Sequence, residues 1–425
     1  MTSVEHTVVH HDDEDAHLAS LGYTSDYKRD MSLWGNFSLG FTYLSPVVGV
    51  YSLFAFALAA GGPPMIWAVV LAAVGQLLVA LVFGEVVSQY PVSGGIYPWA
   101  RRLWGRRWAW MAGWVYMVAL VVTIASVSYG AGPFVAMVLG IEPSTNVTIL
   151  CALALIGVYL YYGFEACGDV AEEVKNPRVQ IPKSMRMTIY VGGFASFLIT
   201  LALLLAVPDF GAVISGKDAD PVTTVLQDAF GAVGFRVVLA VVLISFFSCA
   251  LSLQAAASRL IYSYARDHMM PASHLLSRFS VARAVPPYAL LLAAAVPAVI
   301  VIGSKVSADA LTKIVSFASL GIYLGFMMVV LAALRARLKG WVPSGKFRLG
   351  VWGLPVTIAA FVYQVLAALN MAWPRTPDVP WYDNYIVVLS AFVVVGVGLV
   401  YMLAAKPYLR KDAPHGDAVR STVDA

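Results

Sequence analysis

The sequence predicts an all-α polytopic membrane protein, and three observations support this fold class. Of the 425 residues, 60% are hydrophobic and only 12% are charged. That charged share is about half the share found in a soluble domain, and the mean hydropathy is +0.77. The charged residues are confined to short stretches between long apolar runs. A soluble chain could not cover such a surface with polar groups, so the excess apolar surface is expected to face lipid.

Ten of the apolar runs are long enough to span a bilayer. A helix rises 1.5 Å per residue, so roughly 20 apolar residues cross about 30 Å of hydrocarbon. Because lipid offers no hydrogen-bond partners, each run can satisfy its backbone groups only as a helix. The runs lie at about 33–60, 64–90, 108–139, 147–171, 187–207, 235–262, 286–303, 309–334, 353–373 and 384–405.

The ten runs place one transmembrane domain, residues 33–405, between an N-terminal tail of residues 1–32 and a C-terminal tail of residues 406–425. Residues 1–30 lack the apolar segment of a cleavable signal peptide, so the first run is expected to insert as its own anchor. Of the 28 Lys and Arg residues, 23 fall in segments on the side of the N-terminus and 5 on the opposite side. The positive-inside rule therefore predicts that both tails are cytoplasmic.

The composition and the motifs exclude several functional classes. A net charge of +4 implies no polyanionic partner such as a nucleic acid. Three cysteines cannot form a disulfide framework, and the seven histidines lie in tails and loops, so no metal site and no cofactor are expected. The nucleotide-binding P-loop and the HExxH and GxSxG motifs are missing from the sequence. An enzyme or an ATP-driven pump is therefore not expected, and an ion gradient would drive any transport.

The first run contains residues that favour a helix break at membrane depth. Within the sequence Ser-Pro-Val-Val-Gly-Val-Tyr-Ser at 45–52, Pro46 lacks a donor and clashes with the preceding turn, and Gly49 adds backbone freedom. Non-helical backbone inside a bilayer is tolerated where it lines a cavity, and transporters place substrate and ion sites at such breaks. The alternative is a simple proline kink that neighbouring side chains fill.

Four carboxylates occur within nine residues at the end of the fourth run. Glu165, Asp169 and the pair Glu172 and Glu173 are spaced so that they share one helical face. An acidic group inside a span is costly and marks a functional candidate. Glu165, which aromatic and glycine residues flank, is the best candidate to hold a cationic amine or to carry a proton. The alternative is a solvated position at the cytoplasmic helix end, which is the expectation for Glu172 and Glu173.

Four ordered stretches of the chain resemble one family of transporters. They are residues 18–29 before the first run, 91–97 after the second, 163–182 at the end of the fourth and 265–271 after the sixth. The second reads Pro-Val-Ser-Gly-Gly-Ile-Tyr, the third carries Gly-Phe-Glu and Glu-Glu-Val-Lys-Asn-Pro, and the fourth begins Ala-Arg-Asp. In this order they resemble the amino acid–polyamine–organocation superfamily, in particular its amino acid/choline branch with GABA- and choline-type permeases.

The resemblance implies a LeuT-type inverted-repeat transporter fold, in which substrate binds mid-membrane between broken helices 1 and 6. Glu165 and Asp169 are the candidates for coupling to an ion gradient, with H⁺ as the expected ion. The implied function is uptake of an amino acid or a related amine, such as GABA, choline or a polyamine, across the plasma (inner) membrane. The substrate-binding residues that the resemblance implies are Ser45, Val48, Gly49, Tyr51, Tyr162, Gly163, Phe164 and Glu165.

The chain departs from that family in its number of spans, because the family usually has twelve and the sequence shows ten. The run at 147–171 begins like helix 4 and ends like helix 6, so about two spans' worth of chain is expected to be missing near residues 157–161. Both of those helices cross from outside to inside, so their fusion leaves the predicted orientation unchanged. The chain is then either a permease with an internal deletion, the product of a mis-joined gene model, or a non-transporting degenerate relative. Its oligomeric state stays open.

Overall fold

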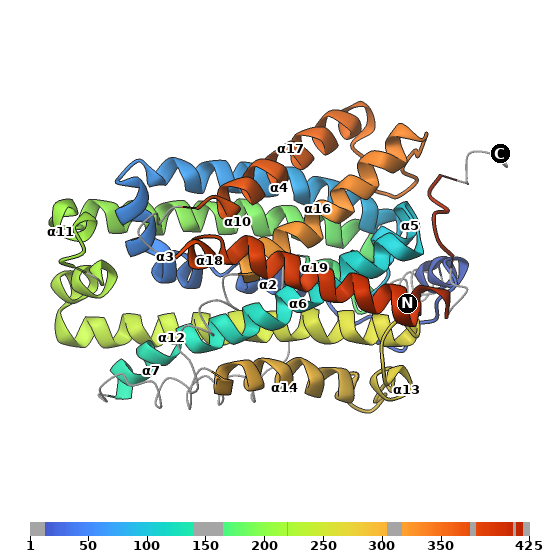
Figure 1. The fold of residues 1–425 in the computed structure, drawn as a ribbon, viewed down its shortest axis with the longest axis horizontal. Coiled ribbons are helices and arrows are strands. Elements are labelled where there is room, and N and C mark those ends of the chain that lie inside the picture. The colour runs from blue at the N-terminus through green and yellow to red at the C-terminus, as the bar shows by residue number, and fades with distance from the viewer. Residues whose placement is uncertain are drawn as a thin grey trace, which may run out of the picture.

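The fold was analysed in a computed structural model of the chain. It describes residues 13–139, 165–218, 220–303, 317–374, 380–410 and 414–419. In these ranges every regular element is a helix, and most of the long helices run along the longest axis of the molecule (Figure 1). The predicted all-helical class is therefore confirmed.

The helices fall into a long and a short group. The long ones are α2 (Leu33–Leu44), α3 (Pro46–Gly61), α4 (Met65–Gln89), α6 (Arg106–Gly130), α10 (Pro177–Ala206), α12 (Pro221–Arg266), α14 (Pro287–Gly303), α16 (Phe317–Leu338), α17 (Gly353–Ala372) and α19 (Ile386–Ala405). The short ones are α5 (Ile96–Leu103), α7 (Gly132–Leu139), α9 (Ala166–Asp169), α11 (Phe210–Ile214), α13 (Ser273–Leu276), α18 (Trp381–Asn384) and the 3₁₀ turns η1 (Gly350–Trp352) and η2 (Pro407–Leu409).

Nine of the ten predicted runs coincide with helices of the described chain. Seven of these helices are long and apolar enough to cross a membrane, eight if the bent pair α2–α3 counts as one span, and α14 is a shorter apolar helix. The predicted run at 147–171 lies mostly outside the described residues, which contain only α9 from it. An integral membrane protein is the class that this set of helices requires.

The sixth predicted run begins fourteen residues too late. The helix α12 starts at Pro221, where the Asp220 carboxylate accepts a hydrogen bond from the Thr223 amide at 3.2 Å and caps it. Gly231 then interrupts the helix with a φ of 62°. The prediction missed the first part because residues 221–234 include polar groups, so the hydropathy rises only beyond Gly231.

The packing places α6 at the centre and α19 at the edge of the bundle. In the apolar window of the span containing α6, 61% of residues are buried, against 11% for α19. α6 packs against α16, α12 and α5, while α10 packs against α4 and α2. A residue on α6 can therefore contact the first span, α12 and the segment around α9. This helix would thus form one wall of a central site.

Both described terminal segments lie at one end of the bundle, beside α5 and α13 (Figure 1). In the N-terminal segment, the His17 ring contacts the Gln89 carbonyl at 3.0 Å. In the C-terminal segment, the Gly416 amide donates to the Arg101 carbonyl at 2.9 Å and the Ala418 amide to that of Arg102 at 3.3 Å. Residues 13–31 and 414–419 are thus packed segments rather than loose tails, and we refer to this end as the inner end.

Candidate functional site

The first span is broken at Ser45, within the stretch where the sequence predicted a break. Ser45 adopts a left-handed conformation, φ 33° and ψ 80°, between the end of α2 and the start of α3 at Pro46. A second change of direction follows within α3, because the segments Leu33–Tyr51 and Leu53–Gly61 are bent by 59° relative to each other. A non-glycine residue in this region is strained, and the missing N–H of Pro46 explains why the helix gives way here.

Two of the predicted substrate residues at the break line a cavity of about 350 Å³ between α3, α4 and α10. These are Ser45 and Gly49, and the other polar residues of the lining are Ser196 and Thr200 on α10. Val48 points into the main core instead, and the half-buried Tyr51 packs against the core clusters on either side. The structure thus divides the predicted residues of the first span between a cavity and the core.

Glu165 is buried on the opposite side of the first span, against α6. Its Oε1 accepts a hydrogen bond from the Tyr116 hydroxyl at 2.9 Å, and its side chain is 1% exposed. Tyr43, on α2 two residues before the break, lies close enough to interact electrostatically with Glu165. Within the described residues, neither Glu165 Oε2 nor the Tyr43 hydroxyl forms a hydrogen bond of ordinary geometry, although Tyr43 lies close enough to Glu165 and Tyr116 to interact with both. Buried polar atoms are normally paired, so this cluster of polar groups is a candidate contact for a polar ligand.

Asp169, one turn further along, lies against the loop that precedes α5. Its backbone carbonyl accepts a hydrogen bond from the Gly94 amide at 3.1 Å, and a Cβ added at Gly95 would lie 2.5 Å from its Oδ1. The side chain is fully buried, and within the described chain both carboxyl oxygens lack a hydrogen-bond partner. Asp169 therefore sits between Glu165 and the inner end, a place where a second ionisable group could exchange a proton.

A reciprocal pair of contacts holds α9 against α2. The Asn36 amide Nδ2 donates to the Cys167 carbonyl at 3.1 Å, and the Cys167 thiol donates to the Asn36 carbonyl at 3.1 Å. Both residues are buried. This contact fixes the position of Glu165 relative to Tyr43, because the two lie close in sequence to Cys167 and Asn36. Of the other predicted residues, Tyr162, Gly163 and Phe164 lie outside the described residues.

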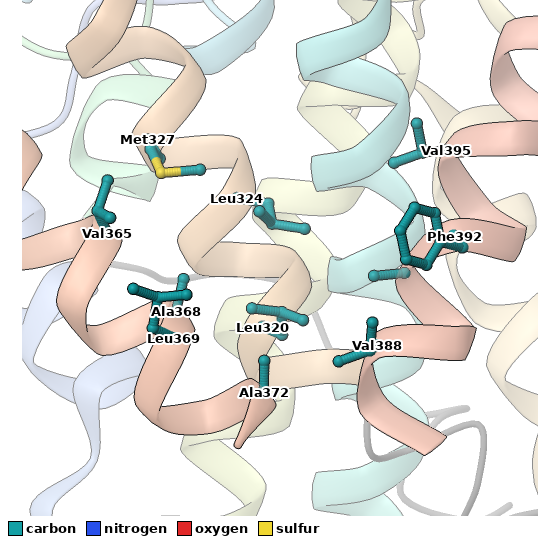
Figure 2. A pocket seen from close by; sticks show the side chains of 11 residues that line it. Leu320, Leu324, Met327, Val365, Ala368, Leu369, Ala372, Val388, Phe392 and Val395 are labelled. Atoms are coloured by element: carbon teal, nitrogen blue, oxygen red, sulfur yellow. The ribbon is translucent and has the colours of Figure 1, made fainter. Parts of the chain in front are cut away.

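Another cavity, of about 360 Å³, lies between α16, α17 and α19 (Figure 2). Its lining comes from these three helices, and Figure 2 shows only apolar side chains around it. An amino acid carries an ammonium and a carboxylate, which lose several kcal/mol when buried without a partner. This cavity is therefore not a site for a charged substrate.

At the inner end, one carboxylate oxygen joins three segments that are far apart in the sequence. Asp267 Oδ2 accepts hydrogen bonds from the hydroxyls of Tyr23 at 3.0 Å and Tyr97 at 2.8 Å, and it forms an ion pair with Arg101 Nη1 at 3.0 Å. Burial, and then the neighbouring Asp267, raise the pKa of both tyrosines, so their hydroxyls stay protonated and donate. We call these four residues the inner hub.

Glu172 and Glu173 are buried and paired, so the prediction that they are solvated was wrong. Glu172 accepts from Arg266 Nη1 at 3.1 Å and from the Ser93 amide at 3.1 Å, while Glu173 pairs with Arg259 Nε at 3.0 Å. Their side chains are 0% and 8% exposed. The sequence could not reveal this, because the arginines that balance the two charges lie on α12, more than 80 residues away.

Gly94 is a position where the inner end tolerates no side chain. Its φ is +91°, and an added Cβ would lie 2.4 Å from the Cβ of Ser263 on α12, which cannot move without the helix. We expect Gly94→Ala to lower the free energy of unfolding by about 2–5 kcal/mol, from backbone strain and overpacking together. Thermal unfolding of the purified protein in detergent measures this. Gly216→Ala is the matched control, because Gly216 has a φ of +75° but no atom within 4 Å of the added Cβ. An equal effect of both substitutions would show that the contact with Ser263 is unimportant.

Comparisons with known proteins agree with the arrangement of helices and motifs. The sequence profile of a family described as "Amino acid permease" matches residues 31–160 and 143–400. The chain belongs to this family. The permease is 24% identical to the "Amino-acid permease BAT1 homolog" of Oryza sativa subsp. japonica, over 93% of both chains. It is also 24% identical to "Amino-acid permease BAT1" of Arabidopsis thaliana, over 85% of this chain and 89% of the relative.

The fold of the permease is also found in a solved structure. A point mutant of the manganese transporter from Eremococcus coleocola superposes with a TM-score of 0.50 at 11% identity, covering 90% of this chain and 95% of the other. The LeuT-type transporter fold implied by the sequence is thereby confirmed for this permease, which is a transporter rather than an enzyme.

Three groups of the site were missed at the level of sequence. Tyr43 and Tyr116 belong to none of the motif stretches, although Tyr43 lies two residues before the predicted break. Residues of the inner hub belong to three of the motif stretches that carry the resemblance. From the sequence alone, each stretch was interpreted as a separate loop. The signal of the hub was present in the motifs themselves, because Tyr23, Tyr97 and Asp267 belong to three of them and Arg101 follows the second by four residues.

Proposed function

We propose that this permease moves an amino acid or a related amine across the plasma membrane, and that movement is coupled to protons at Glu165. The observation that carries the proposal is the burial of a carboxylate near the break of the first span, with one oxygen bound by Tyr116 and the other forming no hydrogen bond of ordinary geometry within the described residues. The names of the relatives support the amino acid as substrate class.

The chemistry of this site fits an ammonium group. A buried carboxylate is stable only when a positive charge or a proton neutralises it. A substrate ammonium can supply the charge and donate to Glu165 Oε2 and to the Tyr43 hydroxyl, which form no hydrogen bond of ordinary geometry within the described residues. Ser45 and Gly49 line the cavity on the other side of the first span, so this contact with the ammonium is proposed for Glu165 and Tyr43 alone.

Transport is coupled to protons if the Glu165 carboxylate binds the substrate ammonium in one half of the cycle and a proton in the other half. Glu165 would take up a proton when the substrate leaves, and Asp169 would pass that proton towards the inner end. The electrostatic interaction between the two carboxylates supports this sequence, because two neighbouring buried carboxylates favour sharing one proton. The inner hub would then close the cytoplasmic side, in line with both tails being cytoplasmic.

A second proposal is that the permease has lost an internal segment and with it part of its transport cycle. The family profile matches in two pieces that overlap at residues 143–160, where the sequence predicts the junction of helices 4 and 6. The alignment to the rice relative runs over 495 positions, which is 70 more than the 425 residues of this chain. Sequencing the gene and its transcript tests this: a continuous transcript that encodes the extra segment would show a mis-joined gene model.

Uptake into proteoliposomes tests transport itself. Purified protein is reconstituted with a pH gradient, and uptake of radiolabelled alanine, glutamate, GABA, choline and putrescine is followed against protein-free vesicles. We expect uptake of at least one of them that rises with an inward proton gradient and collapses with a protonophore. Substrate binding without uptake would favour the non-transporting relative, and neither binding nor uptake of any member would contradict the proposed function.

A further inference from the structure

The chain after α19 returns to the bundle and lies across the inner end. Lys406 ends α19 in a left-handed conformation, with a φ of 44°, and η2 then turns the chain. Tyr408 in η2 is 5% exposed and packs against the main core, with the Arg107 guanidinium 5.0 Å from its ring. Tyr408 therefore anchors this part of the chain, and residues 414–419 lie beyond it on α5. We call residues 414–419 the strap.

The last turn of α5 provides the backbone partners of the strap. The final carbonyls of a helix have no amide donor inside the helix. The carbonyl of Arg101 accepts from the Gly416 amide at 2.9 Å, and that of Arg102 accepts from the Ala418 amide at 3.3 Å. Ala418 is fully buried and belongs to the main core cluster. The strap thus completes both the hydrogen bonding of α5 and the apolar packing beside it.

The side chain of Arg102 joins the strap to the N-terminal segment, residues 13–31. Its guanidinium, 2% exposed, donates from Nη1 to the Asp417 carboxylate and from Nη2 to the Leu21 carbonyl. The two segments also touch directly, because a Cβ added at Gly22 would lie 3.2 Å from Cδ of Pro414. The strap therefore contacts both sides of the junction between α5 and the N-terminal segment.

The same junction is closed by the inner hub. Tyr23 reaches Asp267 from the N-terminal segment, and Tyr97 and Arg101 reach it from α5. When the inner end opens, α5 and the N-terminal segment separate, and the strap must first leave one of them. A contact that exists in only one of two conformations shifts the population towards that conformation. The docked strap therefore favours the closed inner end.

We propose that the strap is an autoinhibitory contact of this permease. Docked on α5 and on the N-terminal segment, residues 414–419 keep the inner end closed and slow the exchange of substrate there. Release of the strap lets the inner end open more often. The side chain of Asp417 is 35% exposed, so its pair with Arg102 is the part of the contact that solvent reaches. The regulatory role rests on the proposed transport function, whereas the closing role of the strap does not.

Amide exchange and thiol labelling of the full chain in detergent test the proposal without any substrate. Asp417→Asn removes the charge opposite Arg102 and should raise the exchange rate of residues 414–419 by up to about fivefold, the range expected of a partly exposed ion pair. Ala418→Arg places a long side chain in a packed position and should raise that rate by about tenfold. In both variants, we expect the buried Cys167 to react faster with a maleimide, as followed by mass spectrometry of its peptide.

The expected result is a faster labelling of Cys167 in both variants, in the same order as the exchange rates of the strap. If the strap exchanges faster while Cys167 reacts at the rate of the unchanged protein, the strap does not hold the inner end closed and the proposal is overturned. If Ala418→Arg leaves the exchange of residues 414–419 unchanged, these residues are not docked on α5, which also overturns it.

The matched control is Asp30→Asn, which neutralises an exposed carboxylate of the N-terminal segment at the same end of the molecule. It should leave the exchange of the strap and the labelling of Cys167 unchanged. An equal rise in both rates would assign the effect to the net charge of the inner end and overturn the role of the strap. Uptake in proteoliposomes tests the regulatory step, because Asp417→Asn should raise the initial rate of substrate exchange. A protein that moves no substrate would contradict the proposed function and leave the labelling results valid.

Discussion

Asp267→Asn is expected to lower the free energy of unfolding by about 3–5 kcal/mol, the cost of leaving a buried charge without its partner. Arg101 and Asp267 are both buried, with side chains 1% exposed. The asparagine keeps a carbonyl that can accept from Tyr23 or Tyr97, but it cannot neutralise Arg101. Thermal and urea unfolding in detergent measure the loss. We also expect an inner end that no longer closes, seen as faster labelling of Cys167 by a thiol reagent.

Two variants make that experiment specific to the charge pair. Asp228→Asn changes an exposed carboxylate on the same helix and should cost less than about 0.5 kcal/mol. Combining Asp267→Asn with Arg101→Gln removes both charges and should recover part of the lost stability, since a neutral pair carries a smaller desolvation cost. If the double variant is as unstable as the sum of its single variants, the hub is held by packing rather than by charge.

Glu165→Gln is expected to reduce proton-driven uptake by about 10- to 100-fold, with the protein still folded. Glutamine is almost the same size as glutamate and can still accept from Tyr116, but it cannot hold a proton or balance an ammonium. A hydrogen bond to a charged group contributes about 1.5–3 kcal/mol, which is the expected loss in substrate affinity. Uptake and substrate exchange in proteoliposomes measure the two effects separately.

The pattern of loss distinguishes the two roles of Glu165. If exchange of substrate persists while uptake no longer responds to the pH gradient, Glu165 is the proton carrier. If binding and exchange disappear as well, it is the partner of the ammonium. Tyr116→Phe is the matched control, because it removes one hydrogen bond of about 0.5–1.5 kcal/mol and leaves the charge in place. An unaltered Glu165→Gln variant would contradict a role of this carboxylate in transport.

Hydropathy was sufficient to place the spanning helices, because the length of an apolar run and the thickness of the bilayer are related directly. The break at Ser45 was also predictable, since proline acts on its own helix and needs no distant partner. The same local reasoning failed for Gly231, where polar residues on the short first part of α12 concealed a helix that is well capped by Asp220.

The partners within the site were beyond the reach of sequence reasoning. Glu165 stood out among the four neighbouring carboxylates because aromatic and glycine residues flank it, but Tyr116 lies 49 residues earlier in the chain and reaches Glu165 only through the packing of α6. Glu172 and Glu173 looked like a solvated pair, because nothing near them in sequence reveals the arginines of α12. Pairings of this kind depend on which helix faces are neighbours, and apolar runs of similar composition do not encode that choice.

The inner hub has a consequence for how this protein changes shape. Three donors from two separate segments converge on a single atom, Asp267 Oδ2: Tyr23 from the N-terminal segment, and Tyr97 and Arg101 from α5. Moving either segment away exposes the charge that the other segment also contacts, so partial separation is the least favourable arrangement. Packed interfaces of this kind have two stable arrangements rather than a continuous range. We therefore expect the inner end to open as an all-or-none event, with single-molecule distance measurements across the hub showing two populations and no intermediate plateau.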